Sequence, residues 1–425
     1  MSSSQTPAEP DASAAVVTDE PSRTHQILRE IVTGNALLSF LAIVLALLIG
    51  SILIAATDDA VQSSLGYFFS RPGDTFVAIG QAIGGAYDAL FRGAIFNINR
   101  TSFVDQIKPI TETLTFATPL IAAGLGVALA FRVGLFNIGG RGQIIMAAAL
   151  GGWISWSFDL PVVIHMVVAV AGAILGGALW GGLAGLLKAR TGAHEVIVTI
   201  MLNYVAYYLV FFLLRTPGAL QAPGSNNPKS PAALETAVLP NLSDLIGVGS
   251  FRLHLGFVLV IAATIYVWYL LNRSSMGFRF RAVGENPNAA RVAGINVKSV
   301  YVAAMLFAGG LMGLAGASQV LGTTTSGFSA GVDAGIGFDA ITVALLGRSK
   351  PWGVFFSGIL FGALKAGGYT MQASQGVPID IILVVQSVIV LLIAAPPLVR
   401  SVFRLPAPGS APRRRAARLA EGAAK

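Results

Sequence analysis

The sequence predicts an all-α polytopic membrane protein with about ten transmembrane helices, and three observations predict it. The 425 residues are 54% hydrophobic and only 11% charged, whereas soluble domains carry roughly 25% charged residues. Apolar runs near 20 residues, the length of a bilayer-spanning helix, recur along the chain. The 49 glycines fit the same class, because small residues let membrane helices approach closely.

Composition also excludes some kinds of site. The chain has no cysteine and four scattered histidines, so we expect no metal site and no cofactor. The net charge of +8 suggests a nucleic-acid partner at first. However, the arginine-rich C-terminal stretch has no aromatic platform or folded basic domain beside it. We therefore expect no nucleic-acid partner and interpret the basic residues as topology signals.

Ten spans are expected between the two tails, and most of the 28 lysines and arginines lie in loops on one side of them. The positive-inside rule places that side, and with it both termini, in the cytoplasm. The chain is thus expected to be a multi-pass protein of the cell membrane. The expected spans are residues 34–57, 108–131, 142–158, 161–187, 195–214, 254–272, 299–321, 336–347, 352–370 and 379–399.

Composition divides the chain into three parts. Residues 1–30 are polar and rich in Ser, Pro and Ala, which predicts a disordered cytoplasmic tail. Residues 31–399 form the transmembrane domain, and residues 400–425 form a basic cytoplasmic tail that anionic lipid attracts. Residues 66–99 are too polar to span and predict a helix lying on the outer face of the bilayer. The proline-rich residues 216–253 predict an outer loop, which either meets an external partner or simply connects two spans.

Glycines four residues apart mark one face of two expected spans. They occur as Gly177 and Gly181 in the fourth span and as Gly309 and Gly313 in the seventh. This spacing places both glycines of a pair on one side of the helix, where another backbone can come close. We expect close helix packing there and no chemistry.

The loop 273–298 contains the signature of a short capped helix. Asn286 is a candidate N-cap, Pro287 suits the first helical position, and Gly294 can end the helix, which predicts about two turns over 287–293. A helix this short is unstable alone. It either docks its small residues into a partner or is only an ordered turn. The small residues are Ala289, Ala290 and Ala293.

Four stretches, in order along the chain, resemble one family of transport proteins. They are FRVGLFNIGGRGQ (Phe131–Gln143), EVIVTIMLNYVA (Glu195–Ala206), residues 273–298 and FDAITVALLGRSKPWG (Phe338–Gly353). The pattern is similar to permeases of the branched-chain amino acid/ribose class of ATP-binding cassette (ABC) importers, and most similar to their nucleoside-uptake branch. The resemblance covers about residues 108–395. The chain departs from it at Arg141, where relatives usually carry an acidic residue.

The resemblance implies an ABC importer permease fold and a protein that is not itself an enzyme. It implies separate ABC ATPase subunits, a second permease subunit (a copy or a paralogue), an external substrate-binding lipoprotein and a nucleoside substrate. The chain has no G-x-x-x-x-G-K-S/T phosphate loop, so a partner must bind the ATP. The residues expected to couple to that ATPase are Glu285, Asn286, Pro287, Ala289, Ala290, Arg291 and Gly294.

A polar stripe along the fifth span predicts a substrate path. Four residues at four-residue spacing share one face of this helix. They are Glu195, Thr199, Asn203 and Tyr207. A polar face inside a membrane faces the bundle interior or water, and an asparagine can donate and accept hydrogen bonds with a base edge or a sugar hydroxyl. Tyr204 and Tyr207 offer flat faces to a nucleobase. Alternatively, Asn203 only bonds a neighbouring helix and the tyrosines form an interfacial belt.

Two further regions are candidates for the same path. Asp339 begins the short eighth span, with Thr342 on the same side. Its carboxylate either accepts bonds from substrate hydroxyls or caps a half-helix, whose N-terminal dipole favours an acid. Asn137 and Gln143 flank three glycines, which predicts irregular backbone that must be buried or line a cavity. The sequence leaves open whether this loop reaches the substrate or stays at the cytoplasmic edge.

Three other functions remain to be distinguished. Within the same fold, the substrate is instead a ribose-like sugar or a branched-chain amino acid. From another class, the chain is an ion-coupled secondary transporter, which needs titratable groups at mid-membrane. Its carboxylates lie near the ends of expected spans instead. The third is a scaffold that transports nothing.

Overall fold

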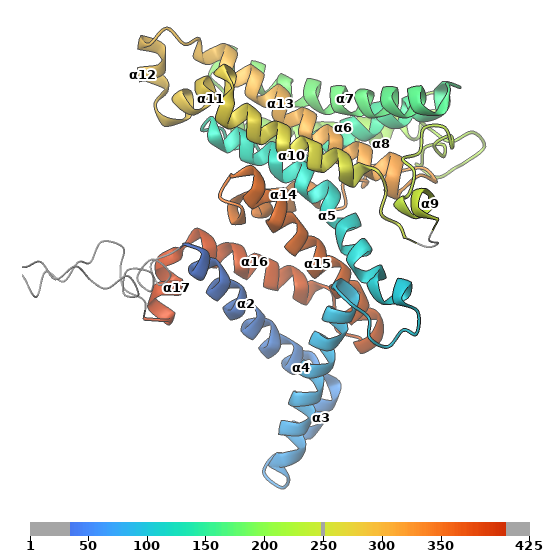
Figure 1. Cartoon of the computed structure of the whole chain (residues 1–425), viewed down its shortest axis with the longest axis vertical. Helices are drawn as coiled ribbons and strands as arrows, with labels where there is room; N and C mark the ends of the chain where they lie inside the picture. The colour runs from blue at the N-terminus through green and yellow to red at the C-terminus, as the bar shows by residue number, and fades with distance from the viewer. Residues whose placement is uncertain (1–34, 248–250, 405–425) are drawn as a thin grey trace, which may run out of the picture. The chain divides into compact units, whose positions relative to one another are not determined.

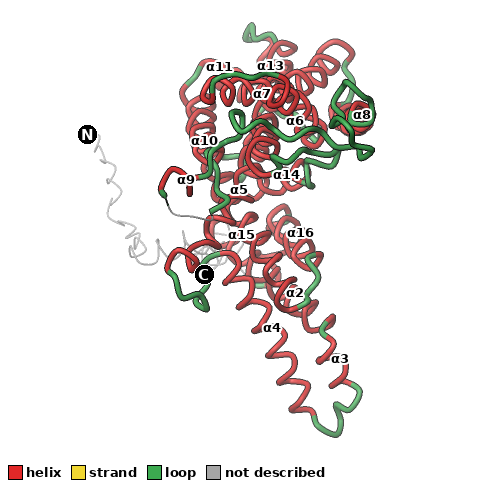
Figure 2. The backbone as a smooth tube through the Cα atoms, turned by 90° about the vertical axis from the view of Figure 1, so that its right-hand side faces the viewer, coloured by secondary structure: helices red, strands yellow, loops and turns green. Residues whose placement is uncertain are grey.

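The computed structural model describes residues 35–247 and 251–404, which fold into helices joined by loops (Figure 1 and Figure 2). Within these ranges there is no β-strand, and one isolated antiparallel bridge joins Asn241 and His254. The predicted all-α class is confirmed. The predicted disordered tail at 1–30, and all of the basic tail beyond residue 404, lie outside the described residues.

The helices follow one another along the chain with mostly short connections. They are α2 (Asn35–Thr57), α3 (Asp59–Leu65), α4 (Pro72–Ala94), α5 (Phe103–Arg132), α6 (Gly140–Ser157), α7 (Val162–Thr191), α8 (Glu195–Leu213), α9 (Leu242–Ile246), α10 (Gly256–Arg273), α11 (Ser275–Glu285), α12 (Pro287–Val292), α13 (Val297–Ser318), the π-helical turn η1 (Gln319–Thr323), α14 (Ile336–Leu346), α15 (Pro351–Gln375), α16 (Asp380–Ala394) and α17 (Pro396–Val402).

The chain forms two compact units. One unit comprises Met1–Ala42 and Ala395–Lys425, of which the start of α2 and helix α17 are described. The other unit, Ile43–Ala394, contains the rest of α2, helices α3 to α16 and every site discussed below.

Each of the ten expected spans falls on a helix, but fewer helices can cross a membrane alone. Seven helices in the described ranges are long and apolar enough, or eight if α16 and α17 count as one span. Helix α6 is not apolar enough, and α14 has only 11 residues. At 1.5 Å per residue, α14 reaches about half of a hydrocarbon core of roughly 30 Å. The expected number of ten complete spans is therefore not confirmed.

Helix α5 is the centre of the second unit. Its residues from Thr115 to Ala130 are nearly all buried, and it contacts both α13 and α15. Helices α6 and α7 pack on α13, and α4 packs on α15. Helix α5 thus contacts both groups of helices.

Helices α7 and α13 approach each other backbone to backbone. A Cβ atom added to Gly309 would lie closer than 3.0 Å to the carbonyl oxygen of Gly177, and one added to Gly181 would lie 2.5 Å from the carbonyl oxygen of Met305. Real Cβ atoms essentially never come so close. The expected packing of the two glycine faces is confirmed.

Residues 66–99 differ from the expectation of a helix that only lies on the bilayer. They contain α4, which buries Ala86, Ala89 and Gly93 and packs against α15. A Cβ on Gly93 would collide with the side chain of Thr370. Small residues on one face of α4 let another helix pack against it. The polar composition of the whole segment gave no indication of this face.

Segment 216–253, which is expected to be an outer loop, is hydrogen-bonded to η1 and to the loop that follows η1. Ala233 N donates to Thr325 O (2.9 Å), Leu239 N donates to Leu321 O (2.8 Å), and the Ser230 hydroxyl accepts from Phe328 N (2.9 Å). Its described residues, 216–247 and 251–253, are mainly irregular, as the prolines predict, with one short helix, α9.

The glycine contact can be tested with two neighbouring residues of α13. Gly309→Ala should destabilise the protein by about 1–3 kcal/mol, because the new methyl group meets the α7 backbone and overpacks the contact. Gly310→Ala should be nearly neutral, since its nearest neighbour is a side-chain carbon of Ile174 at 3.5 Å. Thermal unfolding of both variants in detergent measures the difference. Equal melting temperatures would contradict the close contact.

Candidate functional site

Five polar residues meet inside the second unit, and we call them the polar junction. They are Asn137, Arg141, Gln143, Asn203 and Asp333. They come from the loop before α6, the first turn of α6, the middle of α8 and the loop before α14. All but Arg141 are at most 5% exposed. Polar groups buried to this extent require hydrogen-bond or ionic partners.

Asn203 joins α8 to the irregular backbone before α6. Its Oδ1 accepts a hydrogen bond from Gly142 N (2.8 Å), and its Nδ2 donates to Ile138 O (2.9 Å). Both bonds satisfy backbone groups that lack a helical partner at the start of α6. The side chain thus bonds a neighbouring segment, which is the structural alternative left open by the sequence.

Asn137 and Gln143 form a reciprocal amide pair. Asn137 Nδ2 donates to Gln143 Oε1 (3.2 Å), and Gln143 Nε2 donates to Asn137 Oδ1 (3.1 Å). Asn137 Oδ1 also accepts from Gly139 N (3.0 Å). The stretch from Asn137 to Gln143 is therefore held by hydrogen bonds among its own residues, as irregular backbone requires where water cannot reach it.

The four residues of the expected polar stripe lie on the inward face of α8, whereas Tyr204, the other candidate on this helix, does not. Thr199 is fully buried, and its hydroxyl donates to Glu195 O (2.8 Å). Tyr207 is half-buried and stacks on Phe211, with ring centroids 6.3 Å apart. Tyr204 lies on the other face and is 54% exposed. Because one residue turns the helix by about 100°, Tyr204 does not share the inward face of Asn203, and it does not line an interior path of this chain.

Arg141 and the nearby Tyr207 have partly exposed side chains. Arg141 Nε lies 3.3 Å from Asp333 Oδ1, and its guanidinium carbon lies 5.0 Å from the centroid of the Tyr207 ring. A Cβ added to Gly337 would collide with the backbone of Arg141, so α6 and α14 meet at their N-terminal ends. These ends carry partial positive charge, which suits the Asp333 carboxylate. Sequence reasoning missed Asp333.

Asp339 is the acidic residue in the first turn of α14, but its side chain forms an ion pair and not a capping hydrogen bond. Its Oδ2 lies 2.6 Å from Lys365 Nζ of α15, with both side chains mostly buried. The N-cap of α14 is Gly335, which has no side-chain bond, and Thr342 donates its hydroxyl to the backbone carbonyl of Asp339 (2.6 Å). Lys365 was missed, although a lone cation within an apolar helix signals an anionic partner.

The expected capped helix is present as α12. Asn286 Oδ1 accepts from Asn288 N and Ala289 N, each at 3.0 Å. Gly294 has φ +82°, a conformation that suits glycine at a helix end. The helix ends one residue earlier than expected.

The outward face of α12 differs from the expected one. Ala290 is 4% exposed and packs on the hydrophobic core, whereas Val292 is 91% exposed. Ala289, Arg291 and Ala293 are also exposed. Ala290 thus anchors the helix to its own chain, because a short helix needs an inward contact to persist. Helix α11, which the sequence did not predict, precedes α12 and is capped by Ser274.

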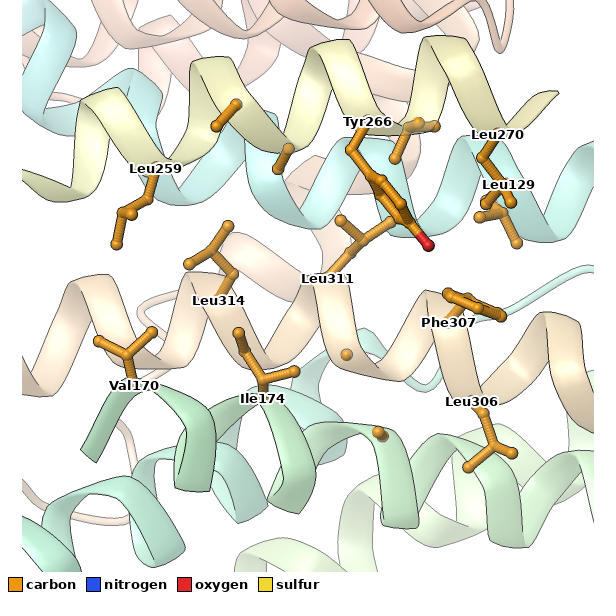
Figure 3. A pocket seen from close by; sticks show the side chains of 15 residues that line it. Leu129, Val170, Ile174, Leu259, Tyr266, Leu270, Leu306, Phe307, Leu311 and Leu314 are labelled. Carbon is orange, nitrogen blue, oxygen red and sulfur yellow. The ribbon is translucent and has the colours of Figure 1, made fainter. Parts of the chain in front are cut away.

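An apolar cavity of about 680 Å³ lies between α10 and α13 (Figure 3). Leu259 and Tyr266 of α10 point toward Leu311 and Leu314 of α13. Among the residues that line it, only Tyr266 has a polar side-chain group. A sugar or a nucleobase needs several hydrogen-bond partners, so this cavity does not suit a polar substrate.

A family model decides the class of the protein. The model described as branched-chain amino acid transport system / permease component matches residues 110–394. The chain belongs to this permease family. It is therefore a multi-pass membrane permease and not an enzyme, and its matched region includes the polar junction, the Lys365–Asp339 pair and α12.

Curated relatives resemble the permease over most of its length. The guanosine ABC transporter permease protein NupP of Bacillus subtilis (strain 168) is 36% identical over 76% of this chain and 89% of the relative. A glucose ABC transporter permease protein of Haloferax volcanii is 34% identical over 67% and 75%. The nucleoside ABC transporter permease protein NupB of Lactococcus lactis subsp. cremoris is 33% identical over 69% and 81%. No solved structure matches the permease.

The Lys365–Asp339 pair can be tested by a double-mutant cycle. Lys365→Met should destabilise the permease by up to about 3 kcal/mol, because it leaves a mostly buried carboxylate without its cation. Adding Asp339→Leu should restore most of the loss. Arg92→Met breaks the more exposed Arg92–Asp88 pair and should cost little. Thermal unfolding in detergent measures all three. A double variant as unstable as the single one would contradict the pairing.

Proposed function

We propose that this permease is the translocation subunit of an ATP-driven importer for nucleosides. The similarity to the guanosine and nucleoside permeases, which extends over most of each chain, carries this proposal. The substrate would be received from an external binding lipoprotein and released into the cytoplasm, while separate ABC ATPase subunits and a second permease subunit complete the assembly. Both termini, with the two tails, would lie in the cytoplasm.

Arg141 of the polar junction and the adjacent Tyr207 are the proposed substrate contacts. Both side chains are partly exposed, and their planar groups already lie against each other. A guanidinium offers several fixed donors to base or ribose oxygens, and an aromatic ring stacks on a nucleobase. Three amide side chains would act as positioning residues: those of Asn137, Gln143 and Asn203. Their hydrogen bonds hold the loop that leads into the first turn of α6, where Arg141 lies. Thr199 packs beside that loop.

The coupling role of α12 is supported by a continuous series of contacts. Ala290 packs α12 on the core, and α12 follows α11 directly. Gly284 of α11 lies against the carbonyl oxygen of Arg132 at the end of α5. The chain then runs from Arg132 into the loop that Asn203 holds. A push on α12 by an ATPase would therefore reach the polar junction through packed backbone, in an alternating-access cycle.

Glucose is the second candidate substrate, because the Haloferax relative is a glucose permease of similar identity. An arginine can bind sugar hydroxyls as readily as a base. A stacked tyrosine favours a flat nucleobase over a pyranose. Branched-chain amino acids are a weaker candidate, because their carboxyl and amino groups need a free cation and a free anion. Asp333, the acidic residue beside Arg141, is already paired with Arg141.

Ion coupling is less consistent with the charges of the described residues. A proton- or sodium-driven carrier needs a titratable or ion-coordinating group available at mid-membrane. Asp339 is paired with Lys365, and Glu195 with Lys188 at 2.6 Å. Uptake that persists after the proton gradient collapses but stops with vanadate would separate the two energy sources.

The substrate proposal is tested by uptake in cells that lack this chain and in cells that regain it. Labelled guanosine, uridine, glucose, ribose and leucine are compared at equal concentrations. We expect nucleoside uptake to fall at least tenfold without the chain and to return with it, while uptake of the others is unchanged. A fall in glucose, ribose or leucine uptake alone would contradict the proposed substrate.

The coupling proposal is tested on the exposed tip of α12. Val292→Glu should lower uptake at least tenfold without lowering the amount of permease in the membrane, because a charge replaces an apolar contact with the ATPase. His194→Glu adds a charge to an exposed residue at the start of α8 and serves as the matched control. Ala290→Trp should instead reduce the amount of folded permease. Normal uptake by the Val292→Glu variant would contradict the proposal that α12 docks on the ATPase.

A further inference from the structure

A second cavity, of about 290 Å³, opens where α10 leads into α11. Three cations line it: Arg132 at the end of α5, Arg281 of α11 and Lys350 just before α15. None of the residues that line it is acidic. In the described ranges, none of the three cations belongs to an ion pair. Three positive charges around one cavity repel one another unless an anion joins them.

One buried donor at this cavity lacks a hydrogen-bond partner, and a helix begins beside it. Arg281 Nη1 is buried and makes no hydrogen bond, which is rare for a buried charged donor. The cavity is also lined by Pro351, Trp352 and Gly353, the first three residues of the 25-residue helix α15. Pro351 has no N–H, but the N–H groups of Trp352 and Gly353 precede the first bond of the helix, and free N–H groups at a helix start favour an anion. Arg132 is held in place, since its Nε donates to Ser349 O (3.0 Å).

The rim of the cavity is aromatic and apolar. Trp268 and Trp352 line it and are 38% and 41% exposed. One helical turn farther along α15, Phe356 is 66% exposed and lies on the same side as Trp352. Tryptophans are enriched at the level of lipid headgroups, with apolar side chains toward the bilayer. A ligand that fits has an anionic head and an apolar tail.

We propose that this cavity binds the phosphate of an anionic phospholipid at the membrane surface. The guanidinium groups of Arg132 and Arg281 and the Lys350 ammonium bind the phosphate oxygens, and the two tryptophans contact the start of the acyl chains. The proposal depends on the chain spanning a membrane and not on its substrate. With the orientation given under the proposed function, the cavity would face the cytoplasmic leaflet.

The test uses the full-length chain, purified in detergent and stripped of lipid. Binding of phosphatidylglycerol, phosphatidylcholine and inorganic phosphate is measured by native mass spectrometry and by the shift in melting temperature. The variants are Arg281→Gln, the double variant Arg281→Gln with Lys350→Gln, and the control Arg279→Gln. Arg279 is exposed on the same helix and does not line the cavity.

Phosphatidylglycerol should bind the unmodified chain and the Arg279→Gln control equally. Its affinity should fall about fivefold for each lining cation removed, since a basic residue near a lipid surface contributes roughly that factor. Melting temperatures without lipid show whether each variant is folded. Equal phosphatidylglycerol affinity in all four proteins would overturn the proposal. So would equal affinity for phosphatidylcholine, or displacement of the lipid by inorganic phosphate at similar concentration.

Discussion

The two hydrogen bonds of Asn203 are the interaction on which the interior of this permease depends. A break between α5 and α6 leaves backbone N–H and C=O groups without helical partners in the buried interior, where water cannot satisfy them. One amide on α8 supplies both a donor and an acceptor to that break. The Asn137–Gln143 pair completes the bonding. The resulting rigid loop fixes where α6 begins, and thereby where Arg141 meets Asp333, Tyr207 and the start of α14.

The sequence predicted what is encoded within a few neighbouring residues. The cap and end of α12 depend on Asn286, Pro287 and Gly294, and the glycine faces of α7 and α13 depend on spacing along one helix. Partners far apart in the chain were missed. Lys365 and Asp339, or Arg141 and Asp333, meet only once several helices have packed, so no local pattern names the pair. Periodicity likewise placed Asn203 on an inward face without naming its partner, and it could not show that Ala290 faces inward.

The end of α5 connects two features that otherwise look separate. The backbone of Arg132 contacts Gly284 on the route from α12 to the polar junction, while its side chain lines the cationic cavity. A ligand held in that cavity would restrain the same residue that a partner moves through α12. The rigidity of this corner comes from glycine, because only a residue without a side chain lets α11 lie directly on the α5 backbone.

The ion pairs of the interior have an electrical consequence. Moving one unpaired elementary charge through a membrane potential changes the free energy by about 2.3 kcal/mol per 100 mV. Arg141 and Asp333 carry opposite charges side by side, as do Lys365 and Asp339. If α6, α14 and α15 shift with each pair intact, these residues transfer no net charge across the field. Movement of these two pairs would therefore add no voltage dependence to the transport cycle.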